Sequence, residues 1–182
     1  MCIRDRYFAA YFEDHPFINV PDILDEFSSK KIMTSVLVVG SKFDEVLEWS
    51  QEEQNLAAET LFRFTFGSIY RLAAFNGDPH PGNYIFHGEG RITFLDFGLV
   101  KHFSEDDTAL FESLITDMVL NRDIAAFRNT IETAGLLPVG QSFSDEAIGE
   151  YFSYFYDFVL EDRTFTFNEE YSAAGVRAST PH

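Results

Sequence analysis

Two short stretches decide how this sequence is interpreted: residues 76–83, NGDPHPGN, and residues 96–98, DFG. The prolines of the first stretch end any preceding helix, and its glycines permit unusual backbone angles, so we expect a stiff loop. Asp78 and Asn83 stand five residues apart in this loop, and Asp96 follows thirteen residues after Asn83. The spacing raises the question of whether these three side chains serve one site.

The segments on either side of the loop have clear patterns. Apolar residues recur at helical intervals between residues 49 and 75, which predicts a long, largely buried helix that runs into the loop. After the loop, YIF (84–86) and RITFL (91–95) flank the turn HGEG (87–90). This pattern predicts a short β-hairpin with Gly88 and Gly90 in its bend. The hairpin leads directly to Asp96.

This order of elements is that of the catalytic region of kinases. Kinases place an Asp in the catalytic loop, an Asn five residues later on a metal ion, and the Asp of DFG on the metal from the other side. We therefore predict that Asp78 orients or deprotonates an acceptor and that Asn83 and Asp96 bind metal. Neither motif is specific alone, but helix, loop, hairpin and DFG together form a strong pattern.

The rest of the chain predicts one α+β domain. Residues 7–12 are typical of the end of a helix, and prolines 16 and 21 favour extended backbone around them. Residues 30–40 form a β-branched run, which predicts a buried strand that ends at Gly40. Further helices are predicted from Ser104, over 123–134 with a stop at Gly135, and from Ser144.

Composition limits the classes of function. The 182 residues are 46% hydrophobic and include 21 Phe, which indicates a globular protein with a real core. The net charge of −17 argues against a nucleic-acid partner. No apolar run reaches the length of a transmembrane segment. The single cysteine, Cys2, excludes an intrachain disulfide and favours a reducing compartment. The expected location is the cytoplasm, with peripheral attachment to a membrane left open.

NGDPHPGNYIF and ITFLDFGLV resemble the motifs of the UbiB/AarF (ADCK) family of atypical kinases, whose members carry a DPHPGN loop and an LDFG segment. HPFINVPDILDEFSSKKIMTSVLVVG is similar to the stretch that leads into the hinge strand of that family. The resemblance covers about residues 11–135. It implies a protein-kinase-like fold of class α+β: a mostly α-helical C-lobe, a short catalytic β-hairpin, and only the hinge-side remnant of the N-lobe.

The resemblance also implies roles, ligands and partners. It makes Asp78 the catalytic residue and Asn83 and Asp96 the ligands of Mg²⁺, with ATP as the nucleotide. The backbone of the hinge at Val36 and Val38 would meet the adenine. The family is associated with ubiquinone or other isoprenoid-lipid metabolism, so proteins of lipid or isoprenoid-quinone pathways are the expected partners. The residues expected to position the loop are His80, Gly82, Phe97 and Gly98.

Parts of a kinase that precede the hinge are not found in this sequence. No GxGxxG and no suitably placed lysine stand before residue 36. We therefore expect a fragment that is inactive alone: residues 1–6 (MCIRDR) as a non-native scar, residues 7–40 as a remnant of the N-lobe and hinge strand, and residues 41–182 as the C-lobe. Within the loop motif, Asn76 stands where the family more often has His.

Three other interpretations stay open. A non-catalytic, pseudokinase-like binding module is favoured by the missing lysine and opposed by the retention of Asp78, Asn83 and Asp96. A small-molecule phosphotransferase of the aminoglycoside- or choline-kinase type would use a similar loop. His80 and Asp96 would instead hold the metal in a phosphohydrolase, although such sites usually gather more histidines.

Overall fold

The structure is a computed structural model that describes residues 2–137, 142–168, 170, 171 and 173. The chain forms two compact units, Met1–Glu105 and Asp106–His182. The first unit contains both sequence motifs. The region expected to be one C-lobe, residues 41–182, is thus divided after Glu105, whereas the expected boundary between the N-lobe remnant and the C-lobe at residue 40 stays a prediction.

The long helix α3 (Gln51–Leu72) confirms that a helix precedes the loop, but it ends before residue 75 and is buried along one face only, not over most of its surface. Ser50 caps its first turn, because the Ser50 hydroxyl accepts a hydrogen bond from the backbone N–H of Glu53 (3.3 Å). The helix ends at Ala73, whose φ of 48° is left-handed. One face of α3 is buried through four residues at helical spacing: Ala57, Thr60, Phe64 and Ser68.

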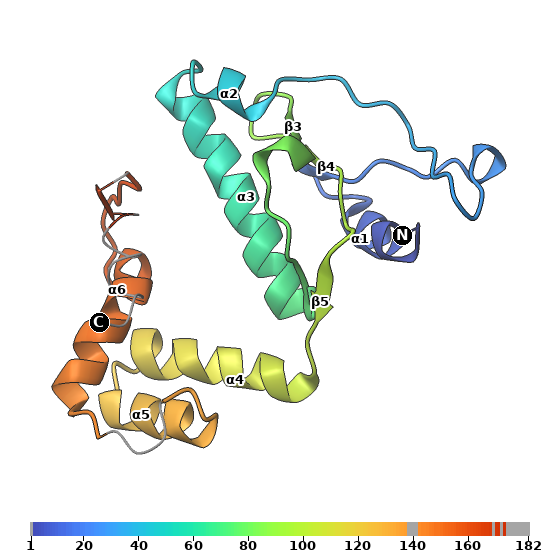
Figure 1. Cartoon of the computed structure of the whole chain (residues 1–182). Coiled ribbons are helices and arrows are strands. Elements are labelled where there is room, and N and C mark those ends of the chain that lie inside the picture. Colours follow the sequence, from blue (N-terminus) through green and yellow to red (C-terminus); the bar gives the residue numbers. More distant parts are fainter. Residues whose placement is uncertain (1, 138–141, 169, 172, 174–182) are drawn as a thin grey trace. The chain divides into compact units, whose positions relative to one another are not determined.

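The predicted hairpin is present as strands β3 (Tyr84–Phe86) and β4 (Ile92–Phe94), which pair antiparallel. Gly88 and Gly90 have φ of 77° and 72°, which glycine adopts without strain, so the bend forms where the sequence placed it. Strand β1 (Ile18–Asn19) adds to β4 in parallel, giving the order β1-β4-β3. Figure 1 shows these strands between α3 and α1.

A second sheet, which the sequence pattern did not predict, frames the loop. Strands β2 (Ala74–Asn76) and β5 (Val100–His102) pair antiparallel, with Asn76 opposite Val100. Each strand has only three residues, so neither shows a readable alternation of apolar and polar side chains. The pair brings the start of the NGDPHPGN loop beside the end of the DFG segment.

Helix α1 (Cys2–Phe12) completes the core of the first unit through aromatic contacts. The ring of Phe64 from α3 stacks on Phe94 of the hairpin, with centroids 3.7 Å apart. Phe8 of α1 lies 4.5 Å from the ring of Phe97 and 5.9 Å from that of Phe64. Because α1 begins at Cys2, residues 2–6 take part in this helix. That residues 1–6 are a non-native scar stays a prediction.

The buried strand predicted for residues 30–40 is not formed. Residues 22–24 and 34–36 face each other in a short antiparallel contact, in which Leu24 N–H donates to Thr34 O and Val36 N–H donates to Asp22 O. Beyond it the chain is exposed, with Leu37 at 85% and Val39 at 80%. The run is apolar, but in the described structure no second strand lies along 37–40, so its residues stay uncovered.

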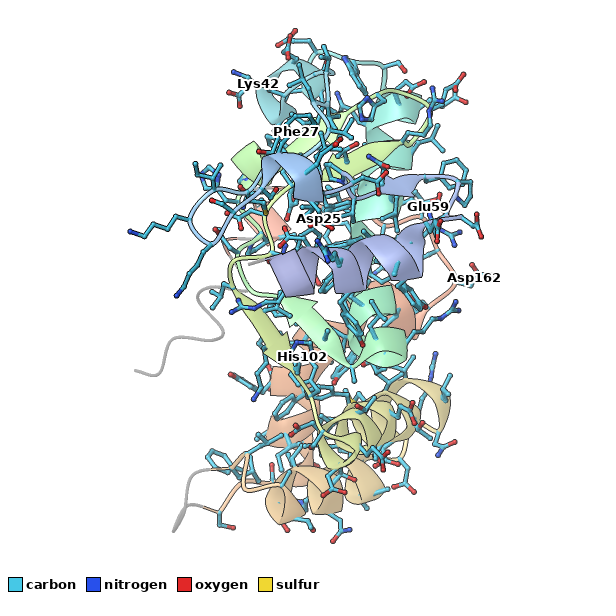
Figure 2. All side chains as sticks on the ribbon, turned by 90° about the vertical axis from the view of Figure 1, so that its right-hand side faces the viewer. Asp25, Phe27, Lys42, Glu59, His102 and Asp162 are labelled. Atoms are coloured by element: carbon cyan, nitrogen blue, oxygen red, sulfur yellow. The ribbon has the colours of Figure 1, made fainter. Side chains whose placement is uncertain are left out.

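Short helical turns precede and follow this exposed segment. The 3-10 turn Asp25–Phe27 is joined to α1 by a side-chain hydrogen bond. Arg6 of α1 donates this bond to the carboxylate of Asp25, a residue labelled in Figure 2. Helix α2 (Phe43–Val46) leads into α3. Between them, Ser41 exchanges two backbone hydrogen bonds with Phe86 (2.8 and 2.9 Å), which fastens the segment to the hairpin.

The second unit is helical, as predicted. It contains α4 (Glu105–Ile115), a π-helical turn (Thr116–Leu120), α5 (Ile124–Thr133) and α6 (Asp145–Leu160). Asp123 and Ser144 cap α5 and α6, and Gly135 (φ 70°) follows the end of α5. The buried core of this unit is Met118, Phe127, Ile131 and Ile148. No helix among the described residues has both the length and the apolar character needed to cross a membrane.

We predict that Phe64→Ala destabilises the first unit by about 3–5 kcal/mol, because it removes a buried ring and leaves a cavity. Trp49, the only tryptophan, reports on this unit by fluorescence during urea unfolding. Phe62→Ala is the matched control, since Phe62 lies on the same helix but is 44% exposed, against 3% for Phe64. Equal losses for the two variants would contradict the assignment of Phe64 to the core.

We also predict that the first unit loses stability on acidification through His15. Its Nδ1 accepts hydrogen bonds from the backbone N–H groups of Phe17 (3.2 Å) and Ile18 (3.0 Å). Burial, and to a smaller extent the charge of Arg63, lowers the pKa of His15 from its ordinary value. The stabilisation is therefore present above about pH 6.5 and is lost as the pH falls through the lowered folded pKa.

His15→Asn keeps a side-chain acceptor that does not titrate. Urea midpoints measured between about pH 7 and pH 5 should fall less steeply in this variant than in the wild type. His102→Asn, at the exposed end of β5 (Figure 2), is the control for replacing a histidine outside this contact. The same slope for His15→Asn and wild type would show that His15 does not titrate in this range.

Candidate active site

Backbone hydrogen bonds join the NGDPHPGN loop to the DFG segment at two places. Gly77 N–H donates to Leu99 O (2.8 Å), next to the pairing of β2 with β5. Leu95 N–H donates to Asn83 O (2.9 Å), at the other end of the loop. Two segments that are separated by the hairpin in sequence are therefore held side by side, as the kinase pattern requires.

The structure brings Asp78 and Asn83 into contact. The Asn83 side-chain amide donates to the backbone oxygen of Asp78 (3.2 Å) and approaches its carboxylate oxygen Oδ2 at 3.5 Å. The contact arises because Pro81–Asn83 forms a 3-10 turn that folds the chain back toward Asp78. With its N–H group directed at Asp78, the Asn83 side chain keeps its carbonyl oxygen for another ligand.

His80 organises this turn from within. Its Nδ1 accepts a hydrogen bond from Gly82 N–H (3.0 Å), and its backbone oxygen accepts one from Asn83 N–H (2.9 Å). A Cβ atom on Gly82 would lie 3.0 Å from His80 Nδ1, so glycine allows this close approach. These contacts support the positioning role expected for His80 and Gly82, and they occupy the Nδ1 lone pair that a metal at this nitrogen would need.

Asp96 and Gly98 are coupled in a similar way. The Asp96 carboxylate oxygen Oδ1 accepts a hydrogen bond from Gly98 N–H (2.6 Å). The other carboxylate oxygen, Oδ2, takes no part in this bond. A Cβ atom on Gly98 would lie 2.9 Å from Oδ1, closer than the contact tolerates. Arg4 donates to the backbone oxygen of Gly98. Asp96 and Gly98 are exposed, whereas Phe97 between them is fully buried against Phe8 and Phe64.

Asn76 is a site residue that the sequence analysis did not assign a role. It is 6% exposed, and its amide donates to the backbone oxygen of Asp96 (2.8 Å). Its Oδ1 also accepts from Asp78 N–H at 3.4 Å. The only signal in the sequence was its place in the motif, where the resembling family more often has His.

Asp78 influences the phenol of Tyr84, the residue after Asn83. Burial is the main cause that raises the pKa of Tyr84, and the negative charge of Asp78 adds to it. Tyr84 is therefore neutral and lies half-buried near the Asp78 carboxylate. Its ring packs edge-to-face against that of Phe94, with the ring centroids 5.3 Å apart.

The donors at this site fit Mg²⁺. Two exposed carboxylates and one carboxamide oxygen are hard ligands, and Mg²⁺ typically takes one or two carboxylates and completes its shell with waters and substrate phosphates. Within the described ranges, no three His, Cys, Asp or Glu side chains gather to hold a metal by themselves. The His80–Asp96 phosphohydrolase stays an alternative. That Asn83 and Asp96 bind metal beside Asp78 stays a prediction.

The two hinge residues lie apart from this group. Val36 and Val38 line a hollow of about 220 Å³ beside α1, together with residues between Ala9 and Asp22. Among the described residues, the lining of this hollow does not include Asp78, Asn83 or Asp96. The N–H of Val36 is bonded to Asp22 O, so Val36 has only its carbonyl to offer to a nucleotide. Adenine binding at the hinge stays a prediction.

Comparison with known proteins agrees with the fold and identifies the family. The model of the ABC1 atypical kinase-like domain matches residues 4–130. The chain is 27% identical, over 157 residues, to the chloroplast protein named Activity of bc1 complex kinase 3 of Arabidopsis thaliana, covering 79% of this chain and 22% of that protein. It is 26% identical, over 140 residues, to the mitochondrial atypical kinase COQ8 of Saccharomyces cerevisiae, covering 76% and 28%.

The chain thus spans about a quarter of the length of these relatives. A solved structure, that of Rv3197 of Mycobacterium tuberculosis in complex with erythromycin, superposes with a TM-score of 0.80 at 22% identity and covers 99% of this chain and 45% of that one. This likeness concerns the fold alone. The family model covers well over half of the residues, and the chain therefore belongs to the ABC1 (UbiB/AarF) family of atypical kinase-like proteins.

Proposed function

We propose that this chain supplies the catalytic loop and the metal-binding segment of an atypical kinase or ATPase that uses ATP and Mg²⁺. The observation that carries the proposal is the contact between Asp78 and Asn83 on a loop that backbone hydrogen bonds tie to the DFG segment. This is the arrangement that phosphoryl transfer needs, because catalysis depends on positioning and on charge neutralisation. The family match favours it over an aminoglycoside- or choline-kinase-like enzyme.

Each residue has a distinct part in this proposal. The exposed Asp78 carboxylate orients the acceptor hydroxyl or water and takes its proton. The Asn83 carbonyl and the Asp96 carboxylate would hold Mg²⁺, which would supply neutralisation of the phosphate charges. The buried ring of Phe97 keeps Asp96 at the surface. The hinge backbone at Val36 and Val38 meets the adenine.

We further propose that the partners belong to lipid or isoprenoid-quinone metabolism. This proposal rests only on the association of the resembling family with ubiquinone or other isoprenoid-lipid metabolism. In the pseudokinase alternative the three polar residues would be retained without turnover. The two hypotheses differ in whether Asp78 and Asp96 are needed for nucleotide hydrolysis, which mutation tests directly.

In a protein that joins this chain to a complete N-lobe, we predict different effects for the two carboxylates. Asp96→Asn should abolish Mg²⁺-dependent nucleotide turnover, because a charge is removed from the metal site. Asp78→Asn should leave nucleotide binding intact and slow turnover by about 10²- to 10⁴-fold, since this residue acts on the acceptor. Asn83→Ala should be intermediate and partly rescued by more Mg²⁺. ATP binding by calorimetry and ATP hydrolysis are measured side by side.

Asp14→Asn is the control, because it removes the same charge from an exposed position outside the site. It should leave both binding and turnover unchanged. Wild-type turnover in all three site variants would overturn the catalytic assignment and favour the pseudokinase alternative.

We predict that Gly98→Ala impairs the same reaction through Asp96. The added Cβ would lie 2.9 Å from Asp96 Oδ1 and would displace the carboxylate from its bond to the backbone. ATP turnover should fall, and the Mg²⁺ concentration needed for half-maximal turnover should rise. Gly67→Ala, where nothing lies within 4 Å, is the matched control and should stabilise α3 by up to about 1 kcal/mol. An unaltered Mg²⁺ requirement in Gly98→Ala would contradict the role given to this glycine.

A further inference from the structure

We propose that a groove beside the hairpin bend binds a basic, partly apolar segment of a partner protein. The groove encloses about 500 Å³ between the exposed segment before Ser41, the start of α3 and the end of β3. Figure 1 shows α2 and the start of α3 beside the hairpin. Among the described residues, the lining of the groove does not include Asp78, Asn83 or Asp96, so the inference goes beyond the proposed nucleotide chemistry.

Three apolar side chains form one part of this groove. Phe86 of β3 is 2% exposed, and Trp49, just before α3, is half-buried and packs against the core of the first unit. Val39 also lines the groove but is 80% exposed. Contact with a partner would remove this aliphatic and aromatic surface from water. This part of the groove therefore fits an aliphatic side chain.

The groove is preformed, because the exposed segment is fixed to the hairpin. Ser41 N–H donates to Phe86 O (2.8 Å), and Phe86 N–H donates to Ser41 O (2.9 Å). Next to this pair, a Cβ atom on Gly40 would lie 2.6 Å from Phe86 O, so glycine allows the close approach of the two segments. Val39 is thereby held near β3. A preformed groove binds at a lower cost in ordering than one that must first assemble.

The polar wall of the groove is the carboxylate of Glu53, in the first turn of α3. Its Oε2 accepts a hydrogen bond from the N–H of Glu89 in the hairpin bend (2.7 Å), which fixes the carboxylate but leaves its negative charge in place. In the described ranges, no Lys, Arg or His forms an ion pair with Glu53. A Lys or Arg of a partner can supply the counter-charge and lay its methylene stem along the ring of Trp49.

The charge around the groove selects the partner. Residues 41–53 carry five carboxylates and one lysine, and Asp44, Glu45 and Glu48 among them are exposed. The whole chain has a net charge of −17. Such a field attracts a basic segment and repels an acidic one, and two copies of this chain would repel each other. The occupant is therefore a protein segment in which Lys or Arg stands beside an aliphatic residue.

The test is a fluorescence titration of the whole 182-residue chain, because its only tryptophan, Trp49, lies in the groove. The probe is a short peptide of Lys-Lys-Leu repeats. We expect a saturable shift of the Trp49 emission, since the peptide covers the ring. Peptides of Lys-Lys-Ser repeats lack the aliphatic group, and peptides of Glu-Glu-Leu repeats lack the positive charge. At matched length, both should bind at least about 10-fold more weakly.

Two variants locate the binding at the groove. Glu53→Gln removes the charge but keeps an oxygen that can accept from Glu89 N–H, and Val39→Ser removes an exposed aliphatic group outside the core. Each should weaken binding of the Lys-Lys-Leu peptide by about 3- to 10-fold. Asp14→Asn is the matched control, since it removes the same charge from an exposed position that does not line the groove, and it should leave the affinity unchanged.

Several results would overturn the proposal. No saturable shift with the Lys-Lys-Leu peptide shows that the groove binds no basic segment. Equal weakening by Glu53→Gln and Asp14→Asn, or equal affinity for the Lys-Lys-Leu and Lys-Lys-Ser peptides, shows attraction to the acidic surface as a whole. Dimers in sedimentation that Val39→Ser abolishes show that a second copy covers the groove. If Glu53→Gln does not fold, Val39→Ser and the peptide series decide alone.

Discussion

The stack of Phe64 on Phe94 is the contact on which the first unit depends. It joins the buried face of α3 to the hairpin at a centroid distance of 3.7 Å, and Phe8 and Phe97 pack around it from α1 and the DFG segment. Buried aromatic rings dominate the energetics of a core, because each removes a large apolar area from water. Four separate segments are thereby held together at one place.

This aromatic cluster also determines which way the DFG segment presents its polar groups. Phe97 is fully buried, whereas Asp96 and Gly98 on either side are exposed. Apolar burial is non-directional, however, and by itself does not orient a carboxylate. Two hydrogen bonds orient Asp96 instead. Gly98 N–H donates to Asp96 Oδ1, and the Asn76 side-chain amide donates to the backbone oxygen of Asp96.

In the NGDPHPGN loop, too, one set of residues sets the backbone shape and another supplies the directional hydrogen bonds. Its prolines and glycines make the backbone compatible with a tight turn, and His80 and Asn83 supply the directional bonds that close it. A kinase-like site on such a short loop needs little covalent machinery, because its task is to place charge and metal ligands accurately. Membership in the ABC1 family and the observed geometry therefore support the same proposed chemistry by independent routes.

The sequence by itself determined the helix before the loop, the hairpin with its glycine bend, the end of α5 at Gly135 and the start of α6 at Ser144. These are local patterns, in which periodicity and turn chemistry act over a few residues. The motif spacing also identified Asp78, Asn83 and Asp96 as candidate site residues, because kinases carry these groups in a fixed order along the chain.

Only the tertiary structure decided the β2–β5 pair, the exposure of residues 37–40 and the contact of Asn76 with Asp96. A three-residue strand has no readable period, and an apolar run is buried only if another segment lies on it. The bond from Asn76 to Asp96 spans twenty residues of sequence. No local pattern signals such a bond, because its partner is a backbone carbonyl, which every residue has.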